Sequence, residues 1–368
     1  MSKTSATAAK RSSNIELLRI VAMLLVVASH FQSASGLPSL YENFGGDVCW
    51  NKLWAQCFGL WGKTVINVFV VITGYFMCTG ALTVRRFLKI FLEMEFYNFA
   101  AFFVLLPLGY ETITAKRLFE LLFWPFSTVN RYFGESFLWF YLFIPFYNVF
   151  IRAATKRQHL CLVGLLLLMF TATSSFFFNK YVFHHVFWYA SLYFLAAAIR
   201  LYPMEWMASR RCCGLLLAGG VALACAWAVG VDFIQRRYNV VCLPHNMFVY
   251  DSHKILAVEI AVSAFLVFRN MSIPYSRLIN AVAATTFGVF LIHTASDGMR
   301  RMIWTDILGV KEHFLLPTWQ FVLYSLASVA GVFATCSVID WFRIRYVETP
   351  FFAWLFPEPV KAVGRGRS

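Results

Sequence analysis

Long apolar segments recur along this chain and limit its possible folds more than any other feature. A helix that crosses the roughly 30 Å hydrocarbon core of a bilayer needs about 17–25 mostly apolar residues. Ten segments reach or approach that length, and the eighth is the shortest of them. They are approximately Ile15 to Phe31, Thr64 to Leu82, Phe87 to Leu108, Gly134 to Ile151, Leu160 to Phe178, Val182 to Ile199, Cys212 to Phe233, Ile255 to Phe268, Leu278 to Thr294 and Phe321 to Ile339.

The composition agrees with this interpretation. Hydrophobic residues make up 60% of the 368 residues and charged residues only 14%, whereas soluble domains contain about 45–50% and 25%. A single water-soluble domain is thereby excluded. We predict an all-α, polytopic membrane protein with about ten transmembrane helices.

The distribution of Lys and Arg predicts the orientation of the chain. An even number of crossings places both termini on one side. With the N-terminus in the cytoplasm, the inner segments contain more Lys and Arg than the outer ones, as the positive-inside rule requires. These loops also explain the net charge of +14, so no nucleic-acid partner is expected. We predict a disordered cytoplasmic tail over 1–14, a transmembrane domain over 15–345 and a basic cytoplasmic tail over 346–368, with both termini cytoplasmic.

The nine cysteines contain no CxxC pair and no spacing typical of a metal site. Cys49, Cys57 and Cys242 fall in predicted outer loops, where an oxidising compartment would permit one disulfide. The alternative is that the cysteines are free thiols that pack as small hydrophobic side chains. The pair His184 and His185 has no further ligand at a matching spacing, so no metal site is expected.

Ionisable side chains within the apolar segments are costly and therefore indicate function. Arg19 and His30 lie in the first segment, eleven positions apart. In an α-helix they would face nearly the same direction, about 16 Å apart along the axis. A neutral imidazole at this depth could accept a proton from an attacking hydroxyl. The alternatives are a helix-end histidine bonded to a carbonyl, and an arginine that reaches lipid phosphate or pairs with Glu16.

The second segment contains Thr73 and Gly74, and the cations Arg85, Arg86 and Lys89 follow at its predicted cytoplasmic end. A glycine lets another backbone or a thin ligand approach the helix closely. Three cations at an inner opening suit a phosphorylated cytoplasmic ligand. Positive-inside topology would by itself place such residues there.

Further ionisable residues in the apolar segments include Glu93, Glu95, Glu259 and His293. An acid in hydrocarbon must be protonated or paired, and Glu93 lies four residues after Lys89, its expected partner. Glu259 has no local partner, so a bond to another helix is expected.

Several motifs resemble the family-3 membrane acyltransferases, which O-acylate bacterial surface glycans. The opening segment from Asn14 to Phe31 is similar to the family's first helix with its Arg-x10-His signature, and the segment from Thr286 to His293 resembles its late Phe-Gly-x-Tyr-Leu-Ile-His motif. Three weaker similarities are the run from Asn67 to Phe76, the segment Phe137-Leu138-Trp139-Phe140, and the basic cluster at Arg85, Arg86 and Lys89. Three positions depart from the family pattern: Thr73 replaces Ser, Phe290 replaces Tyr and Asn67 replaces the more usual Asp.

The resemblance implies an acyl-CoA donor, most often acetyl-CoA, on the cytoplasmic side, no metal, and an acceptor hydroxyl on a cell-surface glycan or its lipid-linked precursor. It implies a location in the bacterial cytoplasmic membrane, in contact with lipid. His30 would be the general base and Arg19 would orient the donor. The donor would be held by Arg85, Arg86 and Lys89 and would pass Thr73 and Gly74, with Trp139, Glu259 and His293 as substrate or structural candidates.

The alternative is a multipass transporter or flippase for a glycan or small solute, in which Glu93, Glu259 and His30 would serve proton coupling. Transporters of this kind often contain internal halves with matching broken helices. The sequence shows no such symmetry, so the acyltransferase interpretation is preferred.

Overall fold

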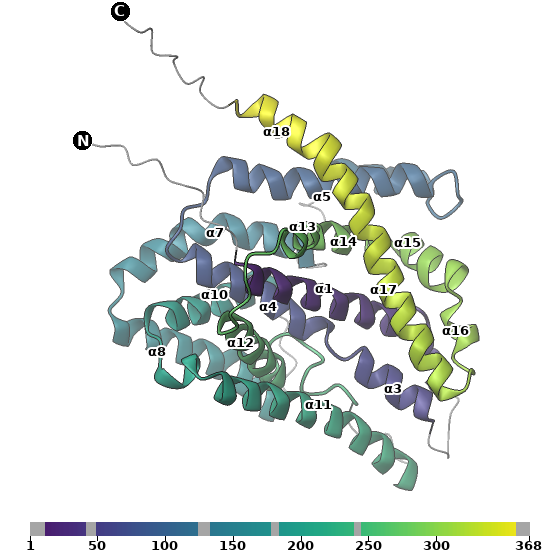
Figure 1. Cartoon of the computed structure of the whole chain (residues 1–368), viewed down its shortest axis with the longest axis horizontal. Helices are drawn as coiled ribbons and strands as arrows, with labels where there is room; N and C mark the ends of the chain where they lie inside the picture. Colours follow the sequence, from purple (N-terminus) through teal and green to yellow (C-terminus); the bar gives the residue numbers. More distant parts are fainter. Residues whose placement is uncertain (1–11, 42–48, 124–132, 178–183, 239–243, 358–368) are drawn as a thin grey trace, which may run out of the picture.

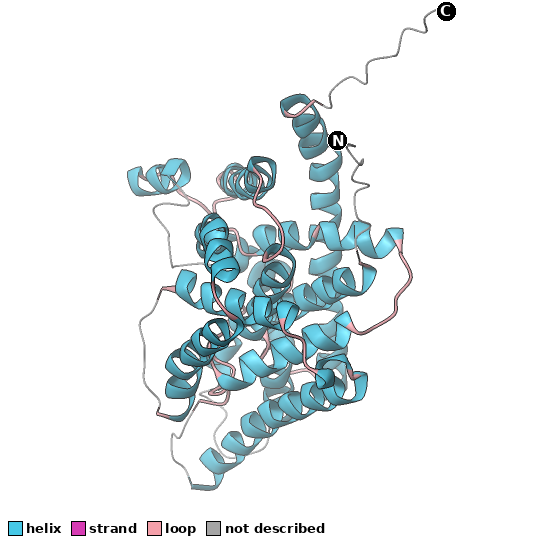
Figure 2. Cartoon of the chain, turned by 90° about the vertical axis from the view of Figure 1, so that its left-hand side faces the viewer, coloured by secondary structure: helices cyan, strands magenta, loops and turns pink. Residues whose placement is uncertain are grey.

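Helices account for all the regular structure in the part of the chain that the computed structural model describes, residues 12–41, 49–123, 133–177, 184–238 and 244–357 (Figure 2). This agrees with the predicted all-α class. The α-helices are α1 (Ser13–Ser33), α2 (Leu37–Tyr41), α3 (Trp50–Phe58), α4 (Gly62–Met77), α5 (Val84–Leu105), α6 (Ala115–Phe123), α7 (Phe133–Ala153), α8 (Lys156–Leu166), α9 (Thr173–Phe176), α10 (His185–Leu201), α11 (Arg210–Tyr238), α12 (Ile255–Arg269), α13 (Arg277–Ala284), α14 (Thr286–His293), α15 (Asp297–Arg301), α16 (Val310–His313), α17 (Thr318–Arg343) and α18 (Thr349–Leu355). Shorter π- or 3₁₀-helical segments are η1 (Leu167–Ala172), η2 (Glu205–Ala208), η3 (Met302–Ile307) and η4 (Ile344–Glu348).

The first helix occupies the centre of the bundle. Figure 1 shows α1 running through the middle of the molecule, with α5 along one edge, α11 along the opposite edge and α17 crossing at a steep angle. Helix α1 contacts α4, α12, α13, α14 and α17. Residues on several faces of α1 are therefore buried, among them Leu18, Val27 and Phe31. A helix in this position can present polar side chains to an enclosed space inside the bundle.

Six helical segments in the described ranges are long and apolar enough to cross a membrane. They are Ser13–Ser33, Trp50–Met77, Phe133–Ala153, Lys156–Phe176, Arg210–Tyr238 and Thr318–Leu355. A seventh results if Arg277–His293 and Asp297–Ile307, which meet at a 99° bend, are counted as one broken span. The helix composition is that of a multi-pass membrane protein.

Each of the ten predicted apolar segments overlaps a helix, although the second and third run past the ends of α4 at Met77 and α5 at Leu105. The described part of the structure contains six or seven candidate spans instead of the ten predicted, because three of these helices are too short or carry too many charges to be counted. Helix α10 has 17 residues and α12 has 15, both short for a full crossing. Helix α5 has 22 residues, but Lys89, Glu93 and Glu95 fall within every 18-residue stretch of it.

Both ends of the described chain are helical. Helix α1 begins at Ser13, and residues 1–11 lie outside the described ranges. At the other end the helix continues from α17 through η4 into α18 and ends at Leu355 (Figure 1). The predicted division into two cytoplasmic tails and a transmembrane domain stays a prediction.

Buried asparagines tie helices to one another by satisfying backbone groups at their ends. The amide of Asn14 donates to the carbonyls of Phe268 and Arg269 (2.9 and 3.2 Å), which close α12. The amide of Asn67 donates to the Ser252 carbonyl (2.6 Å) and accepts from the Trp188 indole (3.1 Å). The NH₂ group and the carbonyl oxygen of Asn67 thus each have a hydrogen-bond partner, which suits an amide at this position better than a carboxylate.

Candidate functional site

A cavity of about 1200 Å³ runs alongside α1. It is bordered by α1, α4, α5, α7 and α14, and its lining includes Arg19 and His30 of the first helix. Arg86 and Lys89 line it at the Arg19 end, whereas Lys63 and Arg300 line it near His30. The stripe predicted from the eleven-residue spacing is therefore one wall of a single cavity.

His30 meets a second histidine inside this cavity. Its Nδ1 lies 2.9 Å from Nε2 of His293, with the ring centroids 5.0 Å apart. His293 is fully buried, and its Nδ1 lies 2.5 Å from the carbonyl oxygen of Val289, one turn earlier on α14. Phe290 packs edge-on against the His293 ring, with the centroids 6.2 Å apart. The sequence predicted both histidines as candidates but did not pair them.

This chain of contacts determines which nitrogen atoms carry protons when both rings are neutral. A carbonyl oxygen only accepts hydrogen bonds, so Nδ1 of His293 is the protonated nitrogen and its Nε2 holds a lone pair. Nδ1 of His30 must then donate to that lone pair. Nε2 of His30 is left unprotonated, which is the form that a general base requires.

The three predicted inner cations differ in their placement. Thr83 caps α5 by accepting a hydrogen bond from the Arg86 backbone (3.3 Å), which places all three in the first two turns. Arg86 lines the cavity and donates to the Ala81 carbonyl (3.0 Å). Lys89 also lines it but pairs with Glu348 at 2.6 Å. Arg85 is not among the lining residues and lies over the Phe356 ring, 5.9 Å from its centroid.

Arg19 is the fourth cation at this end. Its side chain is 36% exposed, and its Nε lies 4.0 Å from Glu16, the partner expected from the sequence. Arg19 of α1 and Arg86 of α5 are thus two arginines from different helices that line the cavity.

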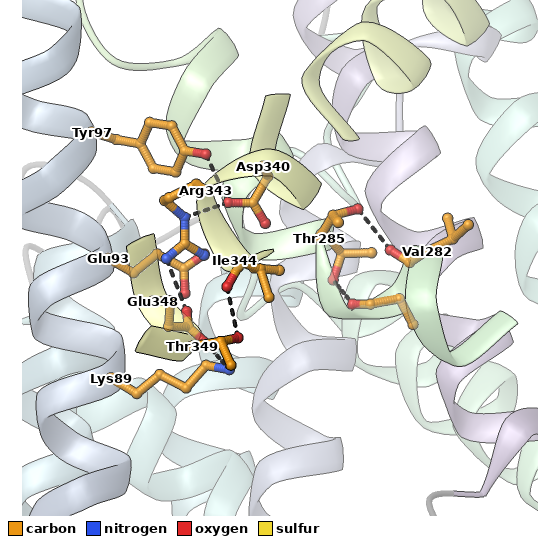
Figure 3. A network of polar contacts seen from close by, with 12 residues as sticks. Lys89, Glu93, Tyr97, Val282, Thr285, Asp340, Arg343, Ile344, Glu348 and Thr349 are labelled. Atoms are coloured by element: carbon orange, nitrogen blue, oxygen red, sulfur yellow. Dashed lines mark hydrogen bonds and ion pairs between the residues drawn. The ribbon is translucent and has the colours of Figure 1, made fainter. Parts of the chain in front are cut away.

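A buried ionic network borders the same end of the cavity (Figure 3). Arg343 of α17 contacts Glu93 of α5 at 2.9 Å, Asp340 at 2.6 Å and Glu348 of η4 at 2.9 Å. The Tyr97 hydroxyl donates to Asp340 at 2.7 Å. Glu93 is thus held mainly by Arg343, whereas the expected partner Lys89 pairs with Glu348.

This network joins the last helices to α5, and it keeps the chain helical beyond residue 345. The sequence analysis did not identify it. The spacing of Asp340 and Arg343, three residues apart in an apolar helix, was the available signal.

Gly288 lies at the centre of the late motif for a packing reason. A Cβ atom at this position would overlap the carboxylate of Asp340, with Oδ2 only 2.6 Å away. Helix α14 can therefore approach α17 only if residue 288 has no side chain. Asp340 in turn belongs to the Arg343 network, so the position of α14, which ends at His293, depends on that network.

Thr73 and Gly74 have different surroundings. Thr73 lines the cavity, and its hydroxyl donates to the Phe69 carbonyl at 2.9 Å. Gly74 faces α10, where an added Cβ would lie 2.8 Å from Cβ of Ala196 and 3.0 Å from Cα of Tyr193. The close approach predicted at this glycine is therefore made by another helix.

Trp139 and Glu259 are not among the residues that line the cavity. Trp139 lies on α7 and packs at the edge of the main core. Glu259 of α12 faces Gly220 of α11, where an added Cβ would overlap its carboxylate. No described hydrogen bond or ion pair joins this carboxylate to another helix, so the bond expected from the sequence stays a prediction.

His245 also lines the cavity, and sequence reasoning missed it. It precedes α12 in a loop outside the helical spans. Burial lowers its pKa from the ordinary value, the charge of Lys52 lowers that pKa further, and the charge of Asp232 opposes the shift. The loop carried no local pattern that would have identified His245.

The structure describes eight of the nine cysteines, and all eight are free. Cys49 and Cys57 are among them, whereas Cys242 lies outside the described residues. The described ranges contain no group of three or more His, Cys, Asp or Glu side chains placed to hold a metal ion.

The fold and the cavity define a class of protein. A helical bundle with six or seven candidate spans surrounds a cavity of mixed polar and apolar lining that the His30 imidazole borders. This is a multi-pass membrane protein with an internal cavity.

The particular family follows from comparison with protein-family models. Residues 12–337 match the model described as an acyltransferase domain, that of acyltransferase family 3. The match covers most of the chain, so the chain belongs to this family, and the resemblance noted from the motifs is confirmed. No curated protein and no solved structure matches the chain. Membership implies a membrane-bound acyltransferase that uses an acyl donor and an acceptor.

Proposed function

We propose that this acyltransferase moves an acyl group, acetyl in the first instance, from cytoplasmic acyl-CoA to a hydroxyl of a cell-surface glycan or its lipid-linked precursor. The observation that carries the proposal is the shared cavity. The unprotonated Nε2 of His30 and the cavity-lining guanidinium of Arg86 border the same space, although they belong to different helices. A donor held at one end could therefore react at the other.

The donor is proposed to bind at the Arg86 end. Arg86 and Arg19 line the cavity there and would contact coenzyme phosphates, which arginine binds bidentately. Lys89 adds positive charge but is already paired with Glu348, and Arg85 contributes only from outside the cavity. The thin pantetheine arm would pass Thr73, and the thioester would reach His30.

The chemistry at His30 needs one base and no covalent enzyme intermediate. Nε2 of His30 takes the proton of the acceptor hydroxyl while the hydroxyl oxygen attacks the thioester carbonyl. The carbon–sulfur bond then breaks, and the protonated imidazole gives its proton to the leaving thiolate. His293 accepts the Nδ1 hydrogen of His30 throughout, and so orients the ring and stabilises its positive charge.

In the proposed orientation both termini of the chain lie in the cytoplasm of a bacterial cell, so that the Arg86 end of the cavity faces the cytoplasmic acyl-CoA. Ten crossings of the inner membrane would result if α5, α10 and α12 complete the spans described above. The family match supports an acyltransferase over the alternative of a transporter or flippase.

The test is His30→Ala in the purified protein, with labelled acetyl-CoA and a glycan acceptor. Loss of general-base catalysis is expected to lower turnover by about 10²–10⁴-fold, while acetyl-CoA binding stays unchanged. His184→Ala is the matched control, because His184 directly precedes α10 and is not among the cavity-lining residues. Turnover of His30→Ala at the rate of the native protein would overturn the assignment.

A further inference from the structure

A second, smaller recess opens beside His30. It has a volume of about 490 Å³ and is lined mainly by polar residues of α1, α15 and η3. These residues are His30, Ser33, Ala34, Asp297, Arg300, Arg301 and Thr305. His30, Ser33, Asp297 and Arg300 also line the large cavity. The imidazole can therefore be reached from two directions, and the recess lies at the opposite end from Arg86.

The sharp bend between α14 and α15 builds this recess. The chain turns by 99° after His293, and Ser296 caps the new helix by accepting a hydrogen bond from the Met299 backbone (3.1 Å). Gly298 packs so closely against the Tyr110 carbonyl that an added Cβ would overlap it. The same bend therefore sets His293 against His30 and fixes the backbone of Arg300 and Arg301 beside them.

Both guanidinium groups of the recess contact aspartates of the same bent segment. Arg300 contacts Asp297 at 2.8 Å, but the Asp297 side chain is 83% exposed. Arg301 is 73% exposed and lies 3.6 Å from Asp306, which also accepts from the Tyr110 hydroxyl at 2.8 Å. Exposed ion pairs contribute little to stability because water screens them. A ligand carboxylate or phosphate can replace these partners, since it offers arginine the same bidentate geometry.

Other charges near His30 favour an anion as well. Lys63, at the start of α4, lines the large cavity on the other side of the imidazole. Asp297 lines the recess and contacts Arg300, while Asp306 contacts Arg301. Arg300, Arg301 and Lys63 together exceed these two carboxylates by one formal positive charge.

We propose that the recess is the acceptor subsite and that Arg300 and Arg301 bind an anionic group of the acceptor saccharide while its hydroxyl reaches His30. This rests on the proposed function. The anion is a carboxylate of an acidic sugar or a phosphate of a lipid-linked saccharide, both of which present oxygen pairs to a guanidinium. The acceptor is accordingly an anionic glycan, and a neutral glycan is a poor substrate.

The experiment compares three acceptors with labelled acetyl-CoA and the full-length protein in lipid nanodiscs: a neutral oligosaccharide, its carboxylated analogue, and the neutral saccharide joined to a polyprenyl diphosphate. We expect an apparent acceptor KM at least about tenfold lower for one of the anionic acceptors than for the neutral one, as loss of a charge-assisted contact predicts. The arm that shows this preference identifies the source of the anion.

Variants then assign the preference to the recess. Arg300→Gln with Arg301→Gln is expected to raise the KM for the anionic acceptor about tenfold and to leave the acetyl-CoA KM and the use of the neutral acceptor unchanged. Arg237→Gln is the matched control, an exposed arginine at the end of α11 outside both cavities. Arg301→Gln alone, at the more exposed position, serves if the double variant does not fold.

Two results would overturn the inference. One is equal use of neutral and anionic acceptors by the native protein. The other is an unchanged acceptor preference in the arginine variants. Either result leaves the proposed function standing as long as His30-dependent acetyl transfer occurs. Absence of acetyl transfer to all three acceptors, together with His30-independent thioester cleavage, would overturn the proposed function and this inference with it.

Discussion

At the scale of single residues, the most informative contact is the hydrogen bond between His30 and His293. Neither ring has a carboxylate partner among the hydrogen bonds and ion pairs described for it. The backbone carbonyl of Val289 instead fixes the proton on His293, and His293 fixes the proton on His30. A neutral hydrogen-bond acceptor, Nε2 of His293, orients the His30 ring without adding a negative charge. An unpaired ion buried among apolar side chains would be costly.

His293→Ala is predicted to lower kcat by about tenfold to a hundredfold, the range typical when an orienting partner is lost. Without His293, the His30 ring can rotate and exchange its protonated nitrogen. The KM for acyl-CoA should not change, because His293 lies away from the Arg86 end of the cavity. Steady-state kinetics in both substrates would check this, and a purely structural role would instead lower the melting temperature and both parameters together.

Arg86 and its neighbour Arg85 provide a test of where the donor phosphates bind. Arg86→Ala is predicted to raise the apparent KM for acyl-CoA by about tenfold, the effect of losing one charge-assisted contact, because Arg86 lines the cavity. Arg85→Ala is the control, since Arg85 lies over Phe356 outside the lining. Isothermal titration with acyl-CoA would compare them. An equal effect of the two variants would contradict the placement of the donor phosphates.

At the scale of elements, glycines decide which helices can touch. Gly74 lets α4 approach α10, and Gly288 lets α14 approach the carboxylate of Asp340 on α17. The sequence identified Gly74 as a point of close approach, but it could not distinguish a glycine that admits a ligand from one that admits a helix. Only the crossing of α4 with α10 made that distinction.

Gly288→Ala is predicted to destabilise the protein by about 1–3 kcal/mol, the usual cost of overpacking a close contact, because the new methyl group overlaps Asp340. It should also reduce turnover, since α14 ends at His293. Gly331→Ala is the matched control on α17, where an added Cβ meets no atom within 4 Å. Thermal unfolding in detergent would measure the difference, and equal melting temperatures would refute the packing argument.

At the scale of the whole molecule, the cavity depends on segments distant in the chain. Helix α1 supplies Arg19 and His30, α5 supplies Arg86, and α14 supplies His293. The Arg343 network holds α5 against α17 and η4 at the Arg86 end (Figure 3). Helices from both ends of the sequence are therefore needed to enclose one space.

Met23→Trp is predicted to stop acyl transfer while acyl-CoA still binds. Met23 lines the cavity on α1, between Arg19 and His30 in the sequence, so a larger side chain there should block passage of the acyl arm. Met23→Ala is the control for loss of the native side chain and should retain turnover. Single-turnover assays with direct binding measurements would test this, and full activity of Met23→Trp would show that the donor takes another route.

The sequence by itself determined the helical class, the family and the common face of Arg19 and His30. These properties depend on local periodicity and on motifs within single segments, and burial of apolar surface in the bilayer enforces them. Tertiary structure decided the partners. His30 and His293 are 263 residues apart in the chain, and Lys89 pairs with Glu348 while Glu93 pairs with Arg343. Such contacts are set by the angles at which helices cross and bend, which spacing along a sequence does not encode.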